Sequence, residues 1–316
     1  MTTLLPPRPP AVPDNPAKGS PARAGRARRN RPGLVWTLPA TVFFLLFAVV
    51  PLIAVVALSF THWTGLGDPR FVGTENWQEL AGDSVMLKSL WLSVLFIVLG
   101  VATQTPISIL LGVWAAGPQR NRAVLSAIFF LPLLLSSAAI SVLWRALLDP
   151  NFGIPGQLEW LFGDGNLFGH QPTAIGVIIF VGMWQFTPFH TLIYQGAAKS
   201  VPPVLYQAAE VDGAGRARQF FSITLPQLRN SIITSVILMV VGGLTTFETV
   251  LILTNGGPGT DTTITAFYMF EEAFRRFDFG MGSAIALVLV VVATGISLIM
   301  VKLSGYDKMR STMEGV

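Results

Sequence analysis

The chain alternates between long apolar blocks and shorter polar connections. Each block is about as long as a membrane-spanning helix, which needs roughly 17–25 predominantly apolar residues. The first block, Leu34–Phe60, contains no Asp, Glu, Lys or Arg over 27 residues. The pattern predicts six membrane-spanning helices, near residues 34–60, 89–115, 123–147, 173–195, 230–254 and 279–303.

The blocks are continuous, whereas the strands of a membrane β-barrel alternate apolar and polar residues in segments of roughly ten. We therefore expect an all-α integral membrane protein. The first block follows an Arg-rich segment, as the apolar part of a signal peptide does. It is much longer than the roughly 7–15 residues of that part, so we interpret it as a first span that is not cleaved.

Composition and charge extend this interpretation. The sequence is 52% hydrophobic and 12% charged, whereas about 25% of the residues of a soluble domain are charged. Lys and Arg are enriched in cytoplasmic loops of membrane proteins. With the N-terminus inside, 16 of the 21 Lys and Arg residues lie on the cytoplasmic side. We therefore expect both termini to face the cytoplasm.

This orientation divides the chain into three parts. Residues 1–33 form a basic, Pro-rich cytoplasmic tail that we expect to be disordered. Residues 34–303 form the six-helix transmembrane domain, with a cytoplasmic loop at 196–229, and residues 304–316 form a short cytoplasmic tail. The N-terminal tail has no aromatic residues between its basic ones, so we interpret the pI of about 9.7 as a result of membrane topology and expect no nucleic-acid binding.

Several kinds of site are absent from the sequence. The chain has no Cys, which excludes disulfides, thiolate metal sites and Cys nucleophiles. His62, His170 and His190 lie far apart and in no metal-ligand spacing. No GxxxxGK[ST] motif occurs, so the chain has no P-loop for a nucleotide. We expect no catalytic residue and no bound metal.

The cytoplasmic loop has a regular pattern. Pro202 and Pro203 suit the start of a helix, and the Asp212–Gly213 pair is typical of its end. A second stretch, Arg216–Ile223, resumes helical spacing before Pro226. Two short helices at a glycine corner allow two interpretations: an amphipathic pair lying on the bilayer surface, or a docking element for a soluble partner.

The spacing of this loop resembles the EAA loop of binding-protein-dependent ABC importer permeases. That pattern reads E-A-A, three residues, Gly, nine residues, then I-x-L-P. Here Gln207-Ala208-Ala209, Gly213 and Ile223-Thr224-Leu225-Pro226 match it at every step. The segments FVGTENWQEL and LTNGGPGTDTT are similar to segments of sugar permeases. The second of them is typical of the MalF-like first permease of a pair, the maltose-transporter type in the carbohydrate-uptake group.

The resemblance implies the type I ABC importer permease fold in a plasma or inner membrane. It implies that the loop docks on a separate ATPase subunit, which binds the ATP and Mg²⁺, so that this chain is a transport subunit and binds no cofactor. The implied partners are a second permease in a heterodimer, two ATPase subunits and an extracellular or periplasmic solute-binding protein. The implied coupling residues are Gln207, Ala208, Ala209, Asp212, Gly213, Ile223, Leu225 and Pro226. Gln207 replaces the family's Glu, which puts one ionic contact with the ATPase in question.

The substrate pathway is expected where polar groups interrupt the spans. Glu248 is an ionisable residue inside the fifth span, next to Phe247, and such a residue is a functional-site hypothesis by default. It either faces the pathway and accepts hydrogen bonds from sugar hydroxyls, or pairs structurally with a neighbour. Trp184 and Gln185 lie near the middle of the fourth span, where an aromatic ring beside an amide suits a sugar. The alternative is that the ring packs against other helices or lipid.

A neutral oligosaccharide or another glycoside is the favoured substrate, because the spans hold no Lys or Arg away from their ends. Glycerol 3-phosphate or a polyol is the alternative within the importer class. An ion-coupled secondary transporter would need a relay of intramembrane ionisable groups, and a membrane enzyme would need a catalytic constellation. The sequence supports neither.

Overall fold

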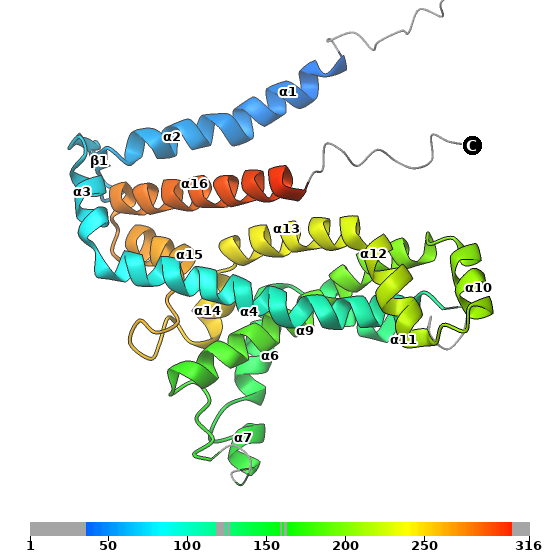
Figure 1. Ribbon diagram of the computed structural model, residues 1–316. Helices are drawn as coiled ribbons and strands as arrows, with labels where there is room; N and C mark the ends of the chain where they lie inside the picture. The colour runs from blue at the N-terminus through cyan, green and yellow to red at the C-terminus, as the bar shows by residue number, and fades with distance from the viewer. Residues whose placement is uncertain (1–35, 118–123, 125–126, 159, 161–162, 305–316) are drawn as a thin grey trace, which may run out of the picture. The chain divides into compact units, whose positions relative to one another are not determined.

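The computed structural model describes residues 36–117, 124, 127–158, 160 and 163–304 (Figure 1). The predicted tails, residues 1–33 and all of 304–316 except its first residue, lie outside the described residues. The chain forms two units, residues 1–50 and 51–316. Nearly all regular structure is helical, as expected; the exception is one two-stranded sheet in which β1 (Thr61–His62) pairs antiparallel with β2 (Arg70–Phe71).

The first predicted span is a continuous helix over Leu38–Leu58, and none of its residues is buried. It consists of α1 (Leu38–Phe44), the π-helical turn η2 (Leu45–Val49) and α2 (Val50–Leu58). The wider π turn ends at Val49, two residues before Pro51. Pro51 has no N–H to donate, and its ring would crowd the preceding turn of an α-helix. The part of this helix before Pro51 belongs to the first unit.

Two long helices form the centre of the second unit. After α3 (Glu75–Gly82), α4 (Ser84–Ala115) runs over 32 residues, and its N-terminus is capped by Asp83, whose side chain accepts from the Val85 N–H at 2.8 Å. The fourth predicted span is α9 (Gln171–Lys199). Both are apolar enough to cross a membrane.

The two helices lie side by side and run parallel. The Gly112 backbone of α4 fits so closely against α9 that an added Cβ would lie 2.7 Å from the Cβ of Tyr194. Towards the end of both helices, Gln195 Nε2 donates to the Ala115 carbonyl at 2.9 Å. Below, the side of the unit where α4 begins is called the Ser84 end, and the side where α4 ends is called the Ala115 end.

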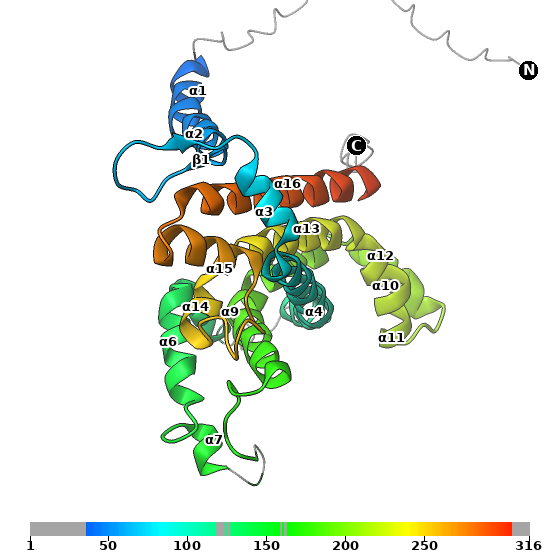
Figure 2. The ribbon, with the colours of Figure 1, turned by 90° about the vertical axis from the view of Figure 1, so that its left-hand side faces the viewer.

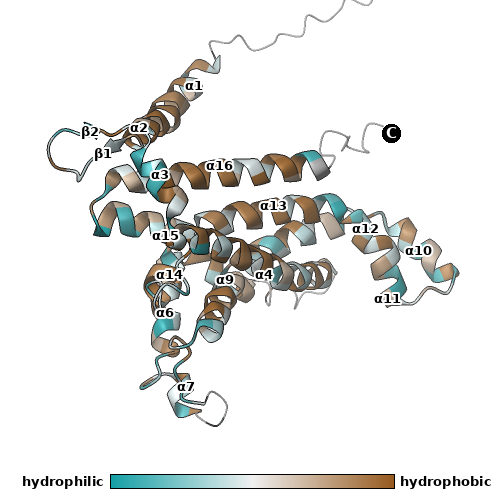
Figure 3. Cartoon of the chain, turned by 60° about the vertical axis from the view of Figure 1, so that its left-hand side comes forward, coloured by the Kyte–Doolittle hydropathy of each residue, from teal (hydrophilic) through white to brown (hydrophobic). Residues whose placement is uncertain are grey.

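The remaining helices complete this bundle. At the Ala115 end lie α10 (Pro203–Val211), α11 (Arg216–Gln219), the π-helical turn η4 (Phe220–Thr224) and α12 (Leu225–Gln227), as Figures 1 and 2 show. From there α13 (Arg229–Thr245) returns antiparallel to α4. Then follow α14 (Glu248–Leu253), α15 (Thr265–Phe270), the π-helical turn η5 (Glu271–Arg275) and α16 (Phe279–Ser304). Hydrophobic residues predominate along α4, α13 and α16, whereas α11 is hydrophilic (Figure 3).

The structure does not show the third and fifth predicted spans as single continuous helices. The third block contains η3 (Leu131–Leu134) and a separate helix α6 (Ser137–Leu147), followed by the short α7 (Ile154–Gln157). The fifth block is interrupted at Thr246–Phe247, between α13 and α14. By length and composition, four described helices can cross a membrane, or five if the segment Arg216–Gln227, bent by 66° against α13, is counted with it.

Candidate functional site

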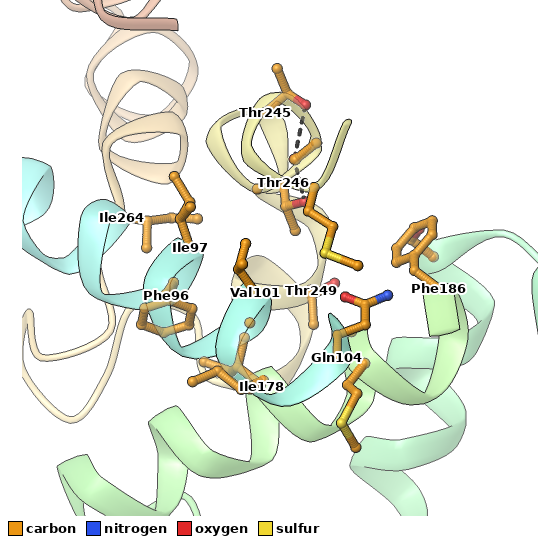
Figure 4. A pocket seen from close by; sticks show the side chains of 18 of the residues that line it. Phe96, Ile97, Val101, Gln104, Ile178, Phe186, Thr245, Thr246, Thr249 and Ile264 are labelled. Atoms are coloured by element: carbon orange, nitrogen blue, oxygen red, sulfur yellow. Dashed lines mark hydrogen bonds between the residues drawn. The ribbon is translucent and has the colours of Figure 1, made fainter. Parts of the chain in front are cut away.

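A cavity of about 580 Å³ lies where these two interruptions meet the long helices. Its walls come from α4, α9 and α13, and Leu133, Ser137, the segment Thr245–Val250 and Ile264 complete it (Figure 4). Interrupted helices in a membrane bundle expose backbone groups that need partners, and such groups are tolerated where protein or a cavity satisfies them. We therefore treat the two breaks and the cavity as parts of one candidate site.

The first break is held by side chains from two helices. Leu135 and Ser136 have extended backbone, with ψ angles of 149° and 150°. The Ser136 side chain caps α6 by accepting from the Ala139 N–H at 3.2 Å. From α9, Gln185 Nε2 donates to the Leu135 carbonyl at 3.1 Å, which gives this carbonyl a partner that the broken helix does not supply.

The second break is held by local bonds, and the helix that follows it is tied at its far end. The Thr246 N–H and its Oγ1 both donate to the Gly242 carbonyl, at 3.0 and 2.8 Å. Phe247 then leaves the helical direction, and Glu248 is the first residue of α14. The far end of α14 is capped by Arg145 of α6, whose Nη1 donates to the Ile252 carbonyl and to the Leu253 carbonyl, the latter at 3.2 Å.

The cavity lining is mostly apolar, with aromatic rings from α4 and α9. Gln104 provides an amide that is 7% exposed and whose Nε2 has no hydrogen-bond partner among the described residues. Figure 4 shows this amide between Thr249 and Phe186. His190 also lines the cavity and shares a hydrogen bond of 2.7 Å with Ser235 Oγ. No Lys or Arg is among the described lining residues.

The structure brings two of the four predicted pathway residues to the cavity. Phe247 and Glu248 line it, and the Phe247 ring stacks on Phe270 at a centroid distance of 5.5 Å. Trp184 packs edge-to-face against Trp144, at 5.5 Å, and is not among the lining residues. Gln185 is 3% exposed and is occupied by the Leu135 carbonyl.

The sequence did not single out Gln104, because it is not an ionisable residue within a span. The available signal was weaker: an uncharged amide at the middle of an otherwise apolar block. Such a residue is ordinary where it packs against another polar group, as Gln185 does. Only the fold distinguishes Gln104, whose Nε2 is buried without a partner, from Gln185, whose Nε2 is bonded.

The second predicted site, the loop at the Ala115 end, consists of two helical pieces around a glycine corner. The helix α10 begins at Pro203 and ends at Val211, as the proline and glycine positions predicted. Gly213 has φ +74°, and its N–H donates to the Glu210 carbonyl at 3.0 Å. The Ala214 N–H donates to the Ala209 carbonyl at 2.8 Å, which completes a Schellman cap.

The second helical piece runs over Arg216–Gln227 and bends at Leu228 into α13. Tyr206 and Thr224 join the two pieces through a hydroxyl–hydroxyl bond of 2.9 Å. The predicted coupling residues share this loop but differ in exposure. Gln207, Ala208, Asp212, Gly213 and Pro226 are exposed, and Ala209, Ile223 and Leu225 are half-buried.

A small hollow separates the two pieces of the loop. It has a volume of about 200 Å³ and is lined by Ala209 and Asp212 from the first piece and by Arg218 and Ile223, among others, from the second. The loop thus presents an exposed helix, α10, beside a shallow depression, on the side of the bundle where α4 and α9 end.

No group of three or more His, Cys, Asp or Glu side chains in the described part of the chain is placed to hold a metal ion. The structure contains a mostly apolar cavity with a few polar lining residues within a helical bundle, and an exposed helix pair at one end of that bundle.

Known proteins resemble this chain over most of its length. The family profile described as "Binding-protein-dependent transport system inner membrane component" matches residues 108–304. The probable ABC transporter permease protein YurN of Bacillus subtilis is 31% identical, over 85% of this chain and 94% of its own length. The diacetylchitobiose uptake system permease protein NgcF of Streptomyces coelicolor is 32% identical, over 86% of this chain and 83% of its own length.

A solved structure shows the same fold. It is titled a bacterial alginate ABC transporter in complex with an alginate pentasaccharide-bound periplasmic protein. The superposition has a TM-score of 0.75 at 22% sequence identity, and it covers 87% of this chain and 94% of the matched chain.

Proposed function

The chain belongs to the family of binding-protein-dependent transport system inner membrane components, and from this premise we propose that it carries a neutral oligosaccharide or glycoside into the cell. As a family member it is a multi-pass membrane permease of an ABC transporter, with the type I permease fold, and a transport component rather than an enzyme. The substrate, the subunit composition and the roles of individual residues are the proposal.

The membrane topology of the proposal has six spans and two cytoplasmic termini. The third and fifth spans would each consist of an inner and an outer piece, the outer ones being α6 and α14. Parallel α4 and α9, with antiparallel α13, agree with this order. We retain the predicted limits, with a transmembrane domain over 34–303 between cytoplasmic tails 1–33 and 304–316. The Ala115 end would then be cytoplasmic and the Ser84 end external.

We assign the coupling role to the loop with α10 and its glycine corner. In the proposed complex, two ATPase subunits bind ATP and Mg²⁺, and this chain binds neither. Gln207, Ala208, Ala209, Asp212 and Gly213 would contact one ATPase, with Ile223, Leu225 and Pro226 shaping the second helical piece. The exposure of α10 and the rigid Schellman cap support a docking element that transmits motion.

One observation carries the transport proposal: the cavity lies where two spans are interrupted in the middle of the bundle. Substrate sites of membrane transporters lie near the bilayer midplane, commonly at discontinuous helices. Glu248, Gln104 and the threonines beside them would hold sugar hydroxyls, and Phe247 would cover an apolar sugar face. Trp184 and Gln185 would act without touching the substrate: Trp184 packs on Trp144, and Gln185 holds the first break.

The charge of the cavity favours a neutral solute. Glu248 lines it, and no Lys or Arg is among the described lining residues. Glycerol 3-phosphate, the alternative substrate, carries a phosphate that would meet a carboxylate without a compensating cation. The relative NgcF is named for the uptake of diacetylchitobiose, which supports a sugar as the substrate, and the choice of a neutral sugar rests on the cavity alone.

The mechanism that this arrangement supports is alternating access. A loaded solute-binding protein would dock at the external side of this chain and of a second, similar permease. Closure of the ATPase pair on ATP would move α10 and the long helices attached to it. The cavity would then open outward to receive the sugar, and ATP hydrolysis on the partner would return it to the inward-open state.

The test is the ATPase activity of the reconstituted complex, with and without its binding protein, across maltose, trehalose, diacetylchitobiose and glycerol 3-phosphate. We expect stimulation by a binding protein loaded with one of the neutral sugars. Stimulation only by glycerol 3-phosphate would contradict the neutral-sugar assignment. Absence of stimulation by every solute, in a complex shown to be intact, would contradict the sugar assignment as a whole.

A further inference from the structure

Two helices that are far apart in sequence form a compact pair beside the cavity. The helices α6 and α14 pack directly against each other, and both views of the fold show them together (Figures 1 and 2). Ile140 of α6 and Val250 of α14 are fully buried in the same core cluster. Both helices begin at the cavity, at Ser137 and Glu248, so they run parallel and away from it.

Each helix of this pair is separated from the rest of its span by extended backbone. Leu135 and Ser136 precede α6, and Thr246, with ψ 115°, precedes α14. Hinges of moving elements are a few loop or terminal residues that absorb changes in φ and ψ. Residues at or directly beside both breaks line the same cavity, so together the breaks provide a region about which the pair can turn.

The far ends of the two helices are tied by one side chain. Arg145, in the last turn of α6, donates from Nη1 to the Ile252 and Leu253 carbonyls at the end of α14. The last four carbonyls of a helix have no partner within that helix. In a membrane such groups must be satisfied by protein, and a guanidinium also suits the negative end of a helix.

We propose that α6 and α14 move as one rigid outer unit during transport, and that Arg145 is the positioning residue that holds this unit together. The unit turns about the breaks at 135–136 and 246–247, which lets the cavity change its access without separating the two helices. The tie to Gln185 fixes the pivot at Leu135 against α9. This inference rests on the proposed function, because it describes how the permease opens.

The test uses the complete transporter, and the chain's lack of Cys makes site-specific labelling direct. One spin-label pair joins Leu143 of α6 to Ile252 of α14, where labelling leaves the Ile252 carbonyl in place. A second pair joins Leu143 to Val241 of α13, across the second break. Both distances are measured by electron paramagnetic resonance in the nucleotide-free and vanadate-trapped complexes.

We expect the Leu143–Ile252 distance to be the same in both states, and the Leu143–Val241 distance to shift. In Arg145→Ala the distribution of the first distance should broaden and uptake should fall about tenfold, because the carbonyls at the end of α14 lose a charged hydrogen-bond donor. Arg145→Lys, which keeps the charge and a donor, should restore part of both. Arg70→Ala removes another exposed arginine from the Ser84 end and should leave both distances unchanged.

Two results would contradict the proposal that α6 and α14 move as one rigid outer unit. One is a shift of the Leu143–Ile252 distance between states in the otherwise unaltered protein, which needs no Arg145 variant and does not depend on the folding of one. The other is an unchanged Leu143–Val241 distance in a preparation whose ATPase is stimulated by the loaded binding protein. In that case the proposed function stands, whereas lack of stimulation in the intact complex contradicts the proposed function itself.

Discussion

Gln104 combines deep burial with an amide nitrogen that has no partner among the described residues. A buried unsatisfied polar group costs roughly 1–3 kcal/mol. We therefore predict that Gln104→Leu raises the stability of the protein by about 1 kcal/mol while it reduces sugar uptake. A purely structural glutamine would lower stability when replaced, so the two measurements together identify its role.

Gln185→Leu is the matched control for this variant. Its Nε2 donates to the Leu135 carbonyl, so the same substitution leaves a buried acceptor without its donor. Apparent melting temperatures should rise for Gln104→Leu and fall for Gln185→Leu. Loss of stability in both variants would contradict the assignment of Gln104 to the substrate.

Glu272 gives the protein a pH-dependent element outside the predicted spans. Its side chain is 7% exposed, and its Oε1 accepts from Arg276 at 2.7 Å. Burial raises the pKa of this carboxyl above its ordinary value of 4.5, with smaller raising effects of Asp278 and Asp83, while Tyr268 and Arg276 act to lower it.

Since the folded-state pKa of Glu272 is raised, the folded protein holds this proton more tightly than the unfolded chain. Its contribution to stability is present below the ordinary glutamate pKa and is lost as the pH rises through the folded-state pKa. We predict that Glu272→Gln flattens the decline in melting temperature above about pH 4.5. Identical pH profiles for the two proteins would refute the prediction.

At the level of single residues, the sequence located Phe247 and Glu248 at the cavity but not Gln104. An intramembrane carboxylate is rare enough to stand out alone. An amide is informative only through its partners, and these lie about 50 residues or more away in sequence, as with Gln185 and Leu135. The predicted roles of Trp184 and Gln185 assumed side-chain directions that only the packing of α9 defines.

Among the elements, the seam between α4 and α9 depends on the absence of one side chain. A Cβ at Gly112 would lie 2.7 Å from the Tyr194 Cβ and 2.9 Å from the Thr191 carbonyl oxygen, so backbone would have to move. We predict that Gly112→Ala destabilises the protein by about 1–3 kcal/mol, the usual cost of overpacking. Melting temperature and the yield of folded protein measure the effect.

Gly196→Ala provides the comparison on the other helix. A Cβ at this position meets nothing within 4 Å, and alanine is a better helix former than glycine. This variant should be neutral or slightly stabilising. A similar loss in both variants would show that the effect of Gly112→Ala is not due to the seam.

The coupling loop depends on a backbone conformation. Gly213 has φ +74°, and a Cβ there would meet nothing within 4 Å, so substitutions act through the backbone alone. Alanine in this region costs about 1–2 kcal/mol, and asparagine costs less. We predict that the amount of solute imported per ATP falls in the order Asn, Ala, Pro, with proline worst because its φ is fixed near −65° and it cannot bond the Glu210 carbonyl.

Membrane insertion should stay normal in all three Gly213 variants, because the spans are untouched. This is the internal control, measured as the amount of permease in washed membranes. Unimpaired uptake by Gly213→Pro would contradict the coupling role of the loop.

Hydropathy located the apolar blocks but not the breaks within two of them. Both breaks occur in apolar surroundings, at Leu135–Ser136 and Thr246–Phe247, where a pair of serine or threonine residues is compatible with an intact helix. The first break is bonded by Gln185 of another helix, and the helix after the second break is bonded at its far end by Arg145. Such distant bonds leave no trace in a local hydrophobic pattern, whereas the helix ends of α10 follow from local proline and glycine residues.

On the scale of the whole molecule, the proposed topology makes a directly testable statement. Gln207 in the coupling loop and Asp68 between the two short strands are both exposed. In single-cysteine variants of this cysteine-free chain, we predict that an impermeant maleimide labels position 68 only from outside the cell. Position 207 should react only in inside-out vesicles. Labelling of both from the same side would exclude the six-span arrangement.

The overall helical fold could be predicted because apolar block length is a strong signal and the EAA spacing is specific. The order of packing could not, since the parallel contact of α4 with α9 depends on Gly112 and Gln195, which are ordinary residues in sequence. The resemblance supplied the family, and the structure supplied the cavity.

Two side-chain ties in this part of the molecule share one property. Gln185, at the first break, and Arg145, at the far end of the helix that follows the second break, both bond to main-chain carbonyls. Every amino acid presents the same carbonyl, so positions 135, 252 and 253 can change their side chains without losing these bonds. The requirement for a particular residue falls on the donor side alone. Tolerance to mutation is therefore unevenly divided across this part of the molecule, and a lineage adapting to a new solute can vary the carbonyl side of each tie while the hinge geometry is inherited unchanged.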